Sequence, residues 1–195
     1  MTYFVTGATG FIGRFLVQSL LARGKGTIYV LVRPKSLGKL DELREFWGKD
    51  SIKRVVPIKG DLAQPKLGVS KGDLTKLKGK VKHLFHLGAV YDLEASAEEM
   101  HKANIVGTES ALAFANAVNA GCFHLVSSIA AAGLYRGTFT EDMFEEAEDL
   151  DHPYYRTKHD SEGLVRANGR IPFRVYRPGV VVGQLGTDQS PVVER

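Results

Sequence analysis

The chain has 195 residues, of which 44% are hydrophobic and 25% are charged, a balance typical of a folded globular domain. We therefore expect one domain over residues 1–195. The net charge of +4 is not arranged as a stripe of basic and aromatic residues, so we expect no nucleic-acid partner. No leader precedes the first strand-like run and no apolar run approaches the length of a membrane span, so we expect a cytoplasmic protein without a transmembrane segment.

Cysteine and histidine usage argues against disulfides and metals. The single cysteine, Cys122, cannot form an internal disulfide, and it excludes a cysteine-rich zinc site. The histidines are scattered, apart from His83 and His86 at the end of one apolar segment, which we interpret as structural. We expect no metal ion.

Strand-like and helix-like segments alternate along the chain. After a β-like run at residues 2–6, glycines precede apolar residues at helical spacing, from Phe11 to Leu20. The pattern predicts strands at 2–6, 27–32, 54–58, 81–87, 123–126 and 173–176, and further helices at 40–47, 95–120 and 154–167. Such alternation predicts an α/β fold, a doubly wound and mainly parallel Rossmann sheet of about seven strands with helices on both faces.

The last part of the sequence contains no segment that could form a substrate-binding part. After the final predicted strand there is only a glycine-containing tail, Gly183–Arg195. In an open α/β sheet the ligand lies in the crevice at the carboxyl ends of the strands. One wall of this crevice has to come from elsewhere, so we expect the chain to be part of a longer enzyme.

A glycine-rich turn between the first strand and the first helix predicts a dinucleotide site. Its spacing is G-x-x-G-x-x-G, one residue longer in the turn than the G-x-G-x-x-G pattern. Glycines let the backbone approach a pyrophosphate, and the helix amino terminus offers unpaired N–H groups and partial positive charge. We expect coenzyme contacts from Thr6, Gly7, Thr9, Gly10, Phe11, Ile12 and Gly13.

The residue that follows the second strand favours NADPH over NADH. An NAD-binding protein usually places an acid there to bond the ribose hydroxyl, whereas this chain has Arg33. A guanidinium can hold a 2′-phosphate with paired hydrogen bonds, and an acid would repel it. Arg14, directly after the glycine turn, is placed to assist. The alternative is that Arg33 is an ordinary surface residue.

Three polar residues form a predicted catalytic set. Tyr154 and Lys158 are four residues apart in a helix that Pro153 opens, so they share one helical face. A tyrosine titrates near pH ~10 and needs nearby positive charge to act as an acid at neutral pH, which Lys158 supplies. Ser128, after the fifth strand, brings a hydroxyl to the same crevice. We expect hydride transfer to a carbonyl whose oxygen is bonded by Ser128 and Tyr154 and protonated by Tyr154.

This order of motifs resembles the extended short-chain dehydrogenase/reductase family over nearly the whole chain. The resemblance rests on TGATGFIG, Gly60-Asp61-Leu62, His86-Leu87-Gly88-Ala89, Asn104, Val126-Ser127-Ser128, the Tyr154/Lys158 pair and YRPGVVVG from Tyr176 to Gly183. It implies that Asp61 bonds the adenine amino group and that Lys158 holds the nicotinamide ribose. The other coenzyme-binding residues that the resemblance implies are Leu62, Gly88, Ala89, Asn104, Pro178, Gly179 and Val180.

Within that family the chain is similar to the amino-terminal module of bacterial alcohol-forming fatty acyl-CoA reductases, which are related to thioester-reductase domains. The similar stretches are MTYFVTGATGFIGRFLVQSLLARG, IYVLVRP, CFHLVSSIAAAGLYRGTF, EDMFEEAEDLDHPYYRTKHDSEGLVR and YRPGVVVG. This resemblance implies an NADP-dependent oxidoreductase of lipid metabolism, which reduces fatty acyl-CoA or a long-chain fatty aldehyde towards fatty alcohol. The substrate-binding part after residue 195 and the second reductase module of those enzymes are absent from the sequence.

Two other functions remain open. A nucleotide-sugar epimerase or dehydratase of the same family shares the coenzyme half and the Tyr/Lys pair, although Arg33 argues against the NAD-retaining epimerases. A non-catalytic NADP-binding module is the second alternative. Cys122 could be imagined as an acyl nucleophile, but it begins a buried strand and has no obvious base, so we interpret it as a structural thiol. The sequence leaves the oligomeric state, the substrate chain length and the reduction step open.

Overall fold

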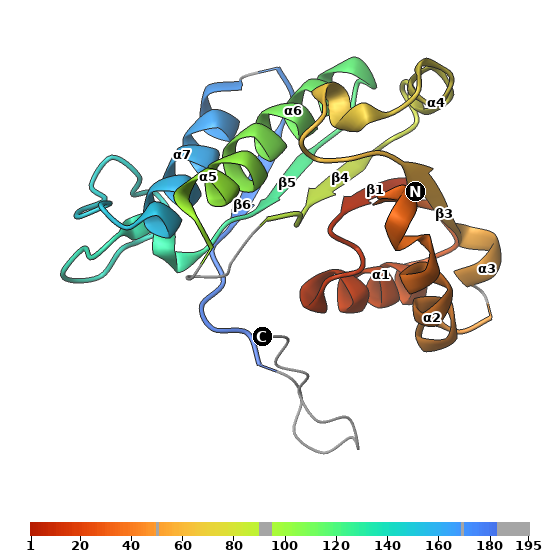
Figure 1. The fold of residues 1–195 in the computed structure, drawn as a ribbon, viewed down its shortest axis with the longest axis horizontal. Helices are drawn as coiled ribbons and strands as arrows, with labels where there is room; N and C mark the ends of the chain where they lie inside the picture. The colour runs from red at the N-terminus through yellow and green to blue at the C-terminus, as the bar shows by residue number, and fades with distance from the viewer. Residues whose placement is uncertain (50, 90–94, 169, 183–195) are drawn as a thin grey trace.

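The computed structural model describes residues 1–49, 51–89, 95–168 and 170–182. Its centre is a six-stranded parallel sheet in the order β3-β2-β1-β4-β5-β6 (Figure 1). The strands are β1 (Tyr3–Thr6), β2 (Ile28–Val32), β3 (Val55–Lys59), β4 (His83–His86), β5 (Phe123–Val126) and β6 (Phe173–Tyr176). The strand order reverses between β1 and β4, and ligands of such sheets bind beside the carboxyl ends of these strands.

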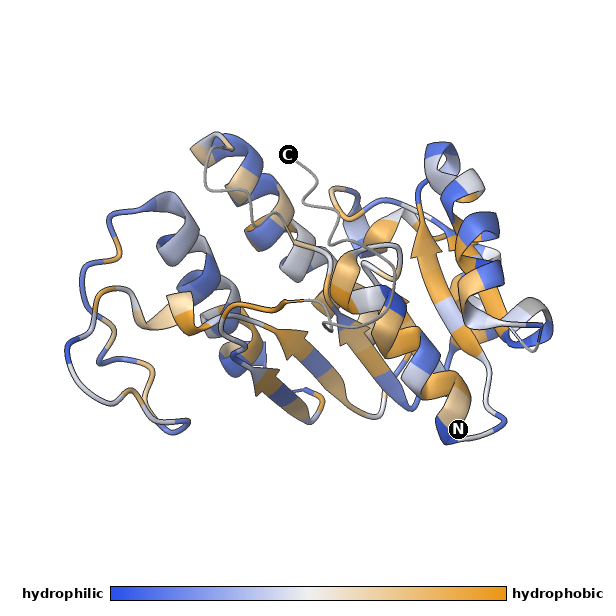
Figure 2. Cartoon of the chain, turned by 90° about the horizontal axis from the view of Figure 1, so that it is seen from below, coloured by the Kyte–Doolittle hydropathy of each residue, from blue (hydrophilic) through white to orange (hydrophobic). Residues whose placement is uncertain are grey.

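Helices lie on both faces of the sheet (Figures 1 and 2). One face is covered by α1 and α2, and the other by α6 and α7. The helices are α1 (Phe11–Arg23), α2 (Leu37–Trp47), α3 (Ser51–Arg54), α4 (Lys71–Leu77), α5 (Ala97–Met100), α6 (Gly107–Ala117) and α7 (Pro153–Asn168). Shorter turns are η1 (Pro34–Ser36), η2 (Pro65–Gly68), the π-helical η3 (His101–Val106) and η4 (Ile129–Ala132).

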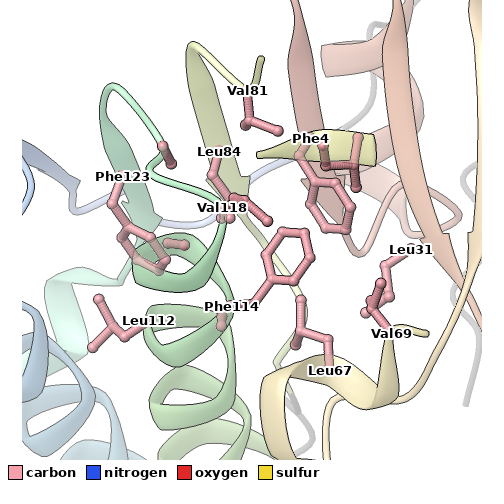
Figure 3. Packing of buried hydrophobic residues seen from close by; sticks show 14 of the residues in the cluster. Phe4, Leu31, Leu67, Val69, Val81, Leu84, Leu112, Phe114, Val118 and Phe123 are labelled. Atoms are coloured by element: carbon pink, nitrogen blue, oxygen red, sulfur yellow. The ribbon is translucent and has the colours of Figure 1, made fainter. Parts of the chain in front are cut away.

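The two apolar cores follow from the alternation of side chains along the strands. Phe4 and Leu84 point to the face covered by α6, where the ring centroids of Phe4 and Phe114 are 4.4 Å apart (Figure 3). Tyr3 and Val5 point to the opposite face and join the core beneath α1 and α2. Burial of each such side chain contributes about 1.5–3 kcal/mol. The cores therefore fix the strand register, because a shift of one residue would exchange the two faces.

The predicted architecture is confirmed, with local differences. The six strand ranges all occur, each within two residues of its predicted ends. The seventh strand of the anticipated count is not present in the described ranges, and Gly183 and the tail that follows lie outside them. No helix in those ranges is both long and apolar enough to cross a membrane.

The predicted single helix over 95–120 is the main correction. It is divided into α5, the π-helical η3 and α6, which ends at Ala117. A π turn takes up about one residue more than an α turn, and so small a shift of the apolar pattern is not recognisable within one helix. The prediction also missed α3 and α4, which have only 4 and 7 residues.

Candidate functional site

The glycine turn after β1 is packed so closely that two of its positions exclude a side chain. Gly7 has φ of 71°, and a Cβ there would lie 2.8 Å from the backbone nitrogen of Gly88. A Cβ on Gly13 would lie 2.8 Å from the Ala8 Cα atom. Both glycines therefore allow β1, α1 and the end of β4 to meet, as a coenzyme-binding turn requires.

The first turn of α1 presents backbone donors beside this loop. Gly10 caps the helix without a side-chain hydrogen bond, and no acidic residue lies in the first turn. Gly10 and Ile12 are exposed, whereas Thr9 and Phe11 are half-buried. A helix amino terminus of this kind attracts phosphate through its N–H groups and its partial positive charge. The turn thus fits a pyrophosphate, since it offers backbone N–H donors and no acidic side chain in the first turn of α1 would repel the anion.

A buried polar network supports the turn from within the sheet. Thr6 Oγ1 lies 2.8 Å from His86 Nδ1 and accepts a hydrogen bond of 3.1 Å from Gly88 N. His86 Nε2 lies 3.2 Å from Thr108 Oγ1. Burial, with a further effect from the charge of Lys158, lowers the pKa of His86 to about 3, so its imidazole is neutral. The hydroxyl of Thr6, a predicted coenzyme contact, is buried in this network, where it holds Gly88 against the turn.

Two arginines lie at the carboxyl edge of the first two strands. Arg33 is exposed and directly follows β2. The guanidinium carbon of Arg14 is 5.1 Å from the ring centroids of both Phe11 and Phe15. Arg14 Nε is buried and has no hydrogen-bond partner within the described ranges, which is uncommon for a buried donor. Arg14 therefore keeps a donor and a positive charge beside the glycine turn.

The loops after β3 and β4 complete this half of the site. Asp61 is half-buried, and its Oδ1 accepts a hydrogen bond of 2.9 Å from Ala63 N. Leu62 packs beneath Gly88, where a Cβ would lie only 2.5 Å from Leu62 Cδ1. Ala89 follows and is half-buried. A side chain at position 88 would therefore require Leu62 to move.

Tyr154 and Lys158 share one face of α7, as predicted from their spacing. Lys158 Nζ lies 6.0 Å from the centroid of the Tyr154 ring, and Lys158 is only 6% exposed. Burial lowers the pKa of Lys158 to about 8, so the side chain is still an ammonium at pH ~7. The structure thus places a buried ammonium beside the ring of Tyr154.

The structure distinguishes the two serines after β5. Ser128 is half-buried and caps η4, where its Oγ accepts a hydrogen bond of 3.1 Å from Ala130 N. That contact leaves the hydroxyl hydrogen able to donate to a ligand. Ser127 is buried and donates to Glu162 Oε2 at 3.2 Å. Both serines therefore lie beside α7, but the hydroxyl of Ser127 is already committed to Glu162.

Asn104 lies in the π-helical turn rather than in a regular helix. It is 2% exposed, and its Nδ2 donates to Thr157 Oγ1 on α7 at 3.1 Å. Since Thr157 directly precedes Lys158, this bond ties η3 to the segment of α7 that carries the predicted catalytic residues. π turns inside helices often mark functional sites. Asn104 was predicted to contact the coenzyme. The hydrogen bond that its side-chain amide makes to Thr157 connects it to α7.

The segment after β6 runs beside η4. Pro178 O accepts a hydrogen bond of 3.1 Å from Ile129 N, Gly179 is exposed, and Val180 is 91% exposed. A cavity of about 510 Å³ lies here, and the predicted site residues that line it are Ile12 and Pro178. Tyr154 and Lys158 do not line it. The cavity therefore extends from Ile12, in the first turn of α1, to Pro178 after β6. The Tyr154/Lys158 pair lies outside it.

Sequence reasoning missed a buried carboxylate on α7. Glu162 is 0% exposed and accepts hydrogen bonds from Arg166 Nε at 2.9 Å and from Arg177 Nη2 at 2.6 Å. Burial acts to raise the pKa of Glu162, but the hydrogen bonds and charges of the two arginines outweigh it and hold the pKa below its usual value. A signal was present, because Glu162 follows Lys158 by four residues and thus shares its helical face.

Arg177 extends this contact to the loop before α7. Its guanidinium also donates to the carbonyl oxygens of Thr140 at 3.1 Å and Met143 at 2.7 Å. Arg177 lies between β6 and Pro178. The Glu162–Arg177 pair therefore connects α7, the 140–143 loop and the segment predicted to flank the nicotinamide.

The predicted residues form two groups at one edge of the sheet. The first is the glycine turn with Thr6, Leu62 and Gly88, which are in direct contact. The second surrounds α7 and η4 and contains Ser128, Tyr154, Lys158, Asn104 and Pro178. Arg33 and Asp61 follow β2 and β3 at the same edge. A parallel sheet produces this grouping, because all its strands end on one side.

Known proteins and solved structures resemble this chain over most of its length. A family model described as male sterility protein matches residues 5–193. The chain is 35% identical over 198 residues to a linear gramicidin synthase of Brevibacillus parabrevis, and the match covers 94% of the chain and 4% of that protein. It is 28% identical over 223 residues to a putative fatty acyl-CoA reductase of Drosophila melanogaster, covering 93% of the chain and 41% of that protein.

Among solved structures, the terminal R domain from the myxalamid PKS-NRPS biosynthetic pathway is similar, with a TM-score of 0.82 and 31% identity. The match covers 93% of this chain and 49% of that one. The chain thus spans less than half the length of each of these proteins. The range of the family match includes β2 to β6 and the loops at the carboxyl edge of the sheet.

Proposed function

Because the chain belongs to the male sterility protein family of extended short-chain dehydrogenases/reductases, we propose that it is the NADPH-binding part of an enzyme that reduces a fatty acyl thioester or fatty aldehyde towards the alcohol. Family membership makes it a reductase-type NAD(P)-binding domain. The observation that carries the catalytic proposal is the buried Lys158 beside Tyr154 on α7. This pair lies at the same edge of the sheet as a turn that fits a pyrophosphate.

The chain's own residues can bind the coenzyme and handle the proton. The backbone of the glycine turn and the start of α1 hold the diphosphate, with Gly88 packed behind the turn. When bound, reduced nicotinamide supplies a hydride to the carbonyl carbon. Ser128 and Tyr154 hydrogen-bond the carbonyl oxygen, Tyr154 gives it a proton, and the ammonium of Lys158 stabilises the phenolate that remains. An aldehyde becomes the alcohol in this step, whereas a thioester becomes a hemithioacetal that releases its thiol as the C–S bond breaks and leaves an aldehyde, which needs a second hydride to become the alcohol.

The NADPH preference is proposed from the arginines. Arg33 directly follows β2 in the place where an acid would serve a ribose hydroxyl, and Arg14 keeps a buried donor beside the glycine turn. Guanidinium groups bind phosphate oxygens through paired, charge-assisted hydrogen bonds. The substrate class is proposed from the relatives, of which one is named a fatty acyl-CoA reductase.

The proposal is tested by following NADPH oxidation with a long-chain acyl-CoA and a long-chain aldehyde as substrates. Turnover is expected with at least one of them, and NADH should support it less well. Tyr154→Phe keeps the ring but removes the proton donor, so turnover should fall by about 100-fold or more while NADPH still binds. Tyr155→Phe is the matched control, a neighbouring half-buried tyrosine whose loss of hydroxyl should leave turnover within about twofold.

Other outcomes identify the alternatives. Conversion of a UDP-sugar with NAD retained, and no consumption of NADPH, would indicate an epimerase or dehydratase instead. Tight NADPH binding without turnover of any carbonyl substrate, in a protein that also contains a substrate-binding part, would indicate a non-catalytic module. Equal activity of Tyr154→Phe and Tyr155→Phe would disprove the assigned proton donor.

A further inference from the structure

Two histidines and the cysteine form a cluster at the amino-terminal edge of the sheet, opposite to the glycine turn. His83 begins β4, Cys122 directly precedes β5, and His124 is the second residue of β5. Their ligand atoms all lie within 4.8 Å of one another, and His83 Nδ1 is 2.9 Å from His124 Nε2. The parallel pairing of β4 with β5 brings these residues together, because the register that places Phe85 beside His124 also places His83 beside Cys122.

We propose that His83, Cys122 and His124 bind a thiophilic transition-metal ion, with Zn²⁺ as the reference ion. Imidazole nitrogens and a thiolate are the ligands that Zn²⁺ prefers, and a tetrahedral site with Zn–N of ~2.0 Å and Zn–S of ~2.3 Å separates its ligand atoms by roughly 3.3–3.6 Å. The two imidazole nitrogens need to separate by a few tenths of an ångström and the thiol to approach by about 1 Å, which side-chain rotation can supply. The fourth position is left for water.

His124 is already oriented as a metal-bound histidine would be. Its Nδ1 lies 3.0 Å from Tyr176 Oη, which leaves Nε2 directed towards His83. Metal-binding histidines commonly hold their second ring nitrogen in such a hydrogen bond, which fixes the tautomer and the ring orientation. The ring of Phe85 stacks on His124 with centroids 4.2 Å apart and restricts the imidazole further.

The charges around the cluster make the thiol the decisive ligand. Arg174 interacts electrostatically with His83, Cys122 and His124, and Arg23 does so with His83. Positive charge opposes a bound cation, and burial raises the pKa of the Cys122 thiol despite the opposite effect of Arg174, so the thiol has to lose its proton to the ion on binding. A site with an anionic ligand can therefore hold the ion, whereas two neutral imidazoles alone would be too weak. The ion would link the first residues of β4 and β5 through three protein ligands.

Nothing in the sequence indicated this group, because the local pattern pairs His83 with His86 instead. Residues three apart in a strand point to opposite faces, and His86 lies in the buried network behind the glycine turn. Only the pairing of β4 with β5 brings in Cys122 and His124.

The test is a titration of the 195-residue chain, first stripped of metal with a chelator, with Zn²⁺ and with Co²⁺ as a coloured substitute. One Zn²⁺ per chain should bind with Kd on the order of micromolar or tighter. Co²⁺ should give a thiolate-to-metal charge-transfer band and the visible spectrum of a tetrahedral ion. At about 100 times Kd, Zn²⁺ should raise Tm by roughly 5 °C or more.

Variants of the ligands decide between a built site and adventitious binding. Cys122→Ser and His83→Gln alter half-buried side chains, and each should lower Zn²⁺ affinity by on the order of 100-fold, with loss of the charge-transfer band in Cys122→Ser. His101→Gln, at an exposed histidine of η3, is the matched control and should bind as the unaltered chain does. Binding only at millimolar Zn²⁺, or equal affinity in Cys122→Ser and His101→Gln, would overturn the proposal.

Discussion

At the scale of single residues, burial determines the charge state of the groups at the carboxyl edge. Lys158 is the clearest case, since its pKa of about 8 instead of 10.5 corresponds to about 3 kcal/mol of unfavourable burial of the charge. The protein tolerates this cost at a position next to Tyr154. A buried charge that lowers the stability of the fold is expected at an active site and is uncommon elsewhere.

The predicted preference for NADPH over NADH rests mainly on Arg33. Arg33→Asp replaces a phosphate-binding charge by one that repels phosphate, so NADPH affinity should fall by at least about tenfold while NADH affinity changes little. Dissociation constants from coenzyme fluorescence titration provide the measurement. Arg170→Asp is the control, an identical change at an exposed arginine at the opposite edge of the sheet, and it should leave both affinities within about twofold. Unchanged NADPH affinity in Arg33→Asp would mean that Arg33 is only a surface residue.

At the scale of elements, α7 depends on contacts with segments distant in sequence. Asn104 bonds Thr157 from η3, and Glu162 bonds Arg177 after β6. These contacts are on either side of Lys158 along the helix. The position of Tyr154 and Lys158 relative to the glycine turn is therefore set by η3 and β6 together, and not by the helix alone.

Glu162→Gln tests the second of these contacts. The change keeps the shape of the side chain but leaves Arg177 and Arg166 without the carboxylate, so the free energy of unfolding should fall by about 3 kcal/mol. Urea denaturation at neutral pH provides the value. Glu42→Gln, at an exposed glutamate of α2, should change it by less than about 0.5 kcal/mol. If the two variants unfold at the same urea concentration, the buried pair contributes nothing to the attachment of α7.

At the scale of the whole molecule, the parallel sheet separates two edges with different roles. The loops after β1 to β6 gather the proposed coenzyme and catalytic residues, whereas the first residues of β4 and β5 gather the proposed metal ligands. Each edge contains a buried histidine whose imidazole is neutral. Burial lowers the pKa of His86 to about 3 and that of His124 to about 4.

The buried His86 predicts acid sensitivity of the entire fold. Its pKa is lower in the folded protein than in the unfolded chain, so between about pH 6.5 and 3 the unfolded chain binds more protons and stability falls as the pH falls. From pH 7 to pH 5 this loss should be about 2 kcal/mol, measured by urea unfolding in metal-free buffer. His86→Asn should remove that part of the pH dependence, and His101→Asn, at an exposed histidine, should retain it. Parallel pH profiles for all three proteins would contradict the prediction.

The strands and the glycine turn were predictable because their signals are local. The run 27–32 is apolar and β-branched, and the glycine turn that begins at Gly7 follows the first strand directly. The Tyr154/Lys158 pair was predictable for the same reason, since helical spacing alone sets their common face. The attachment of Asn104 to α7 and the different roles of Ser127 and Ser128 were not, because they involve partners on α7, at Thr157 and Glu162.

The sequence by itself determined the Rossmann alternation, the turn that fits a pyrophosphate and the helical face of Tyr154 and Lys158, because each depends on residues within a few positions of one another. Only the tertiary structure decided which histidines meet, which serine is available, and how deeply Lys158 and Glu162 are buried. The physical reason is that burial, and with it pKa and hydrogen bonding, is set by strand order and helix packing between segments that are 35 or more residues apart, as for Ser127 and Glu162.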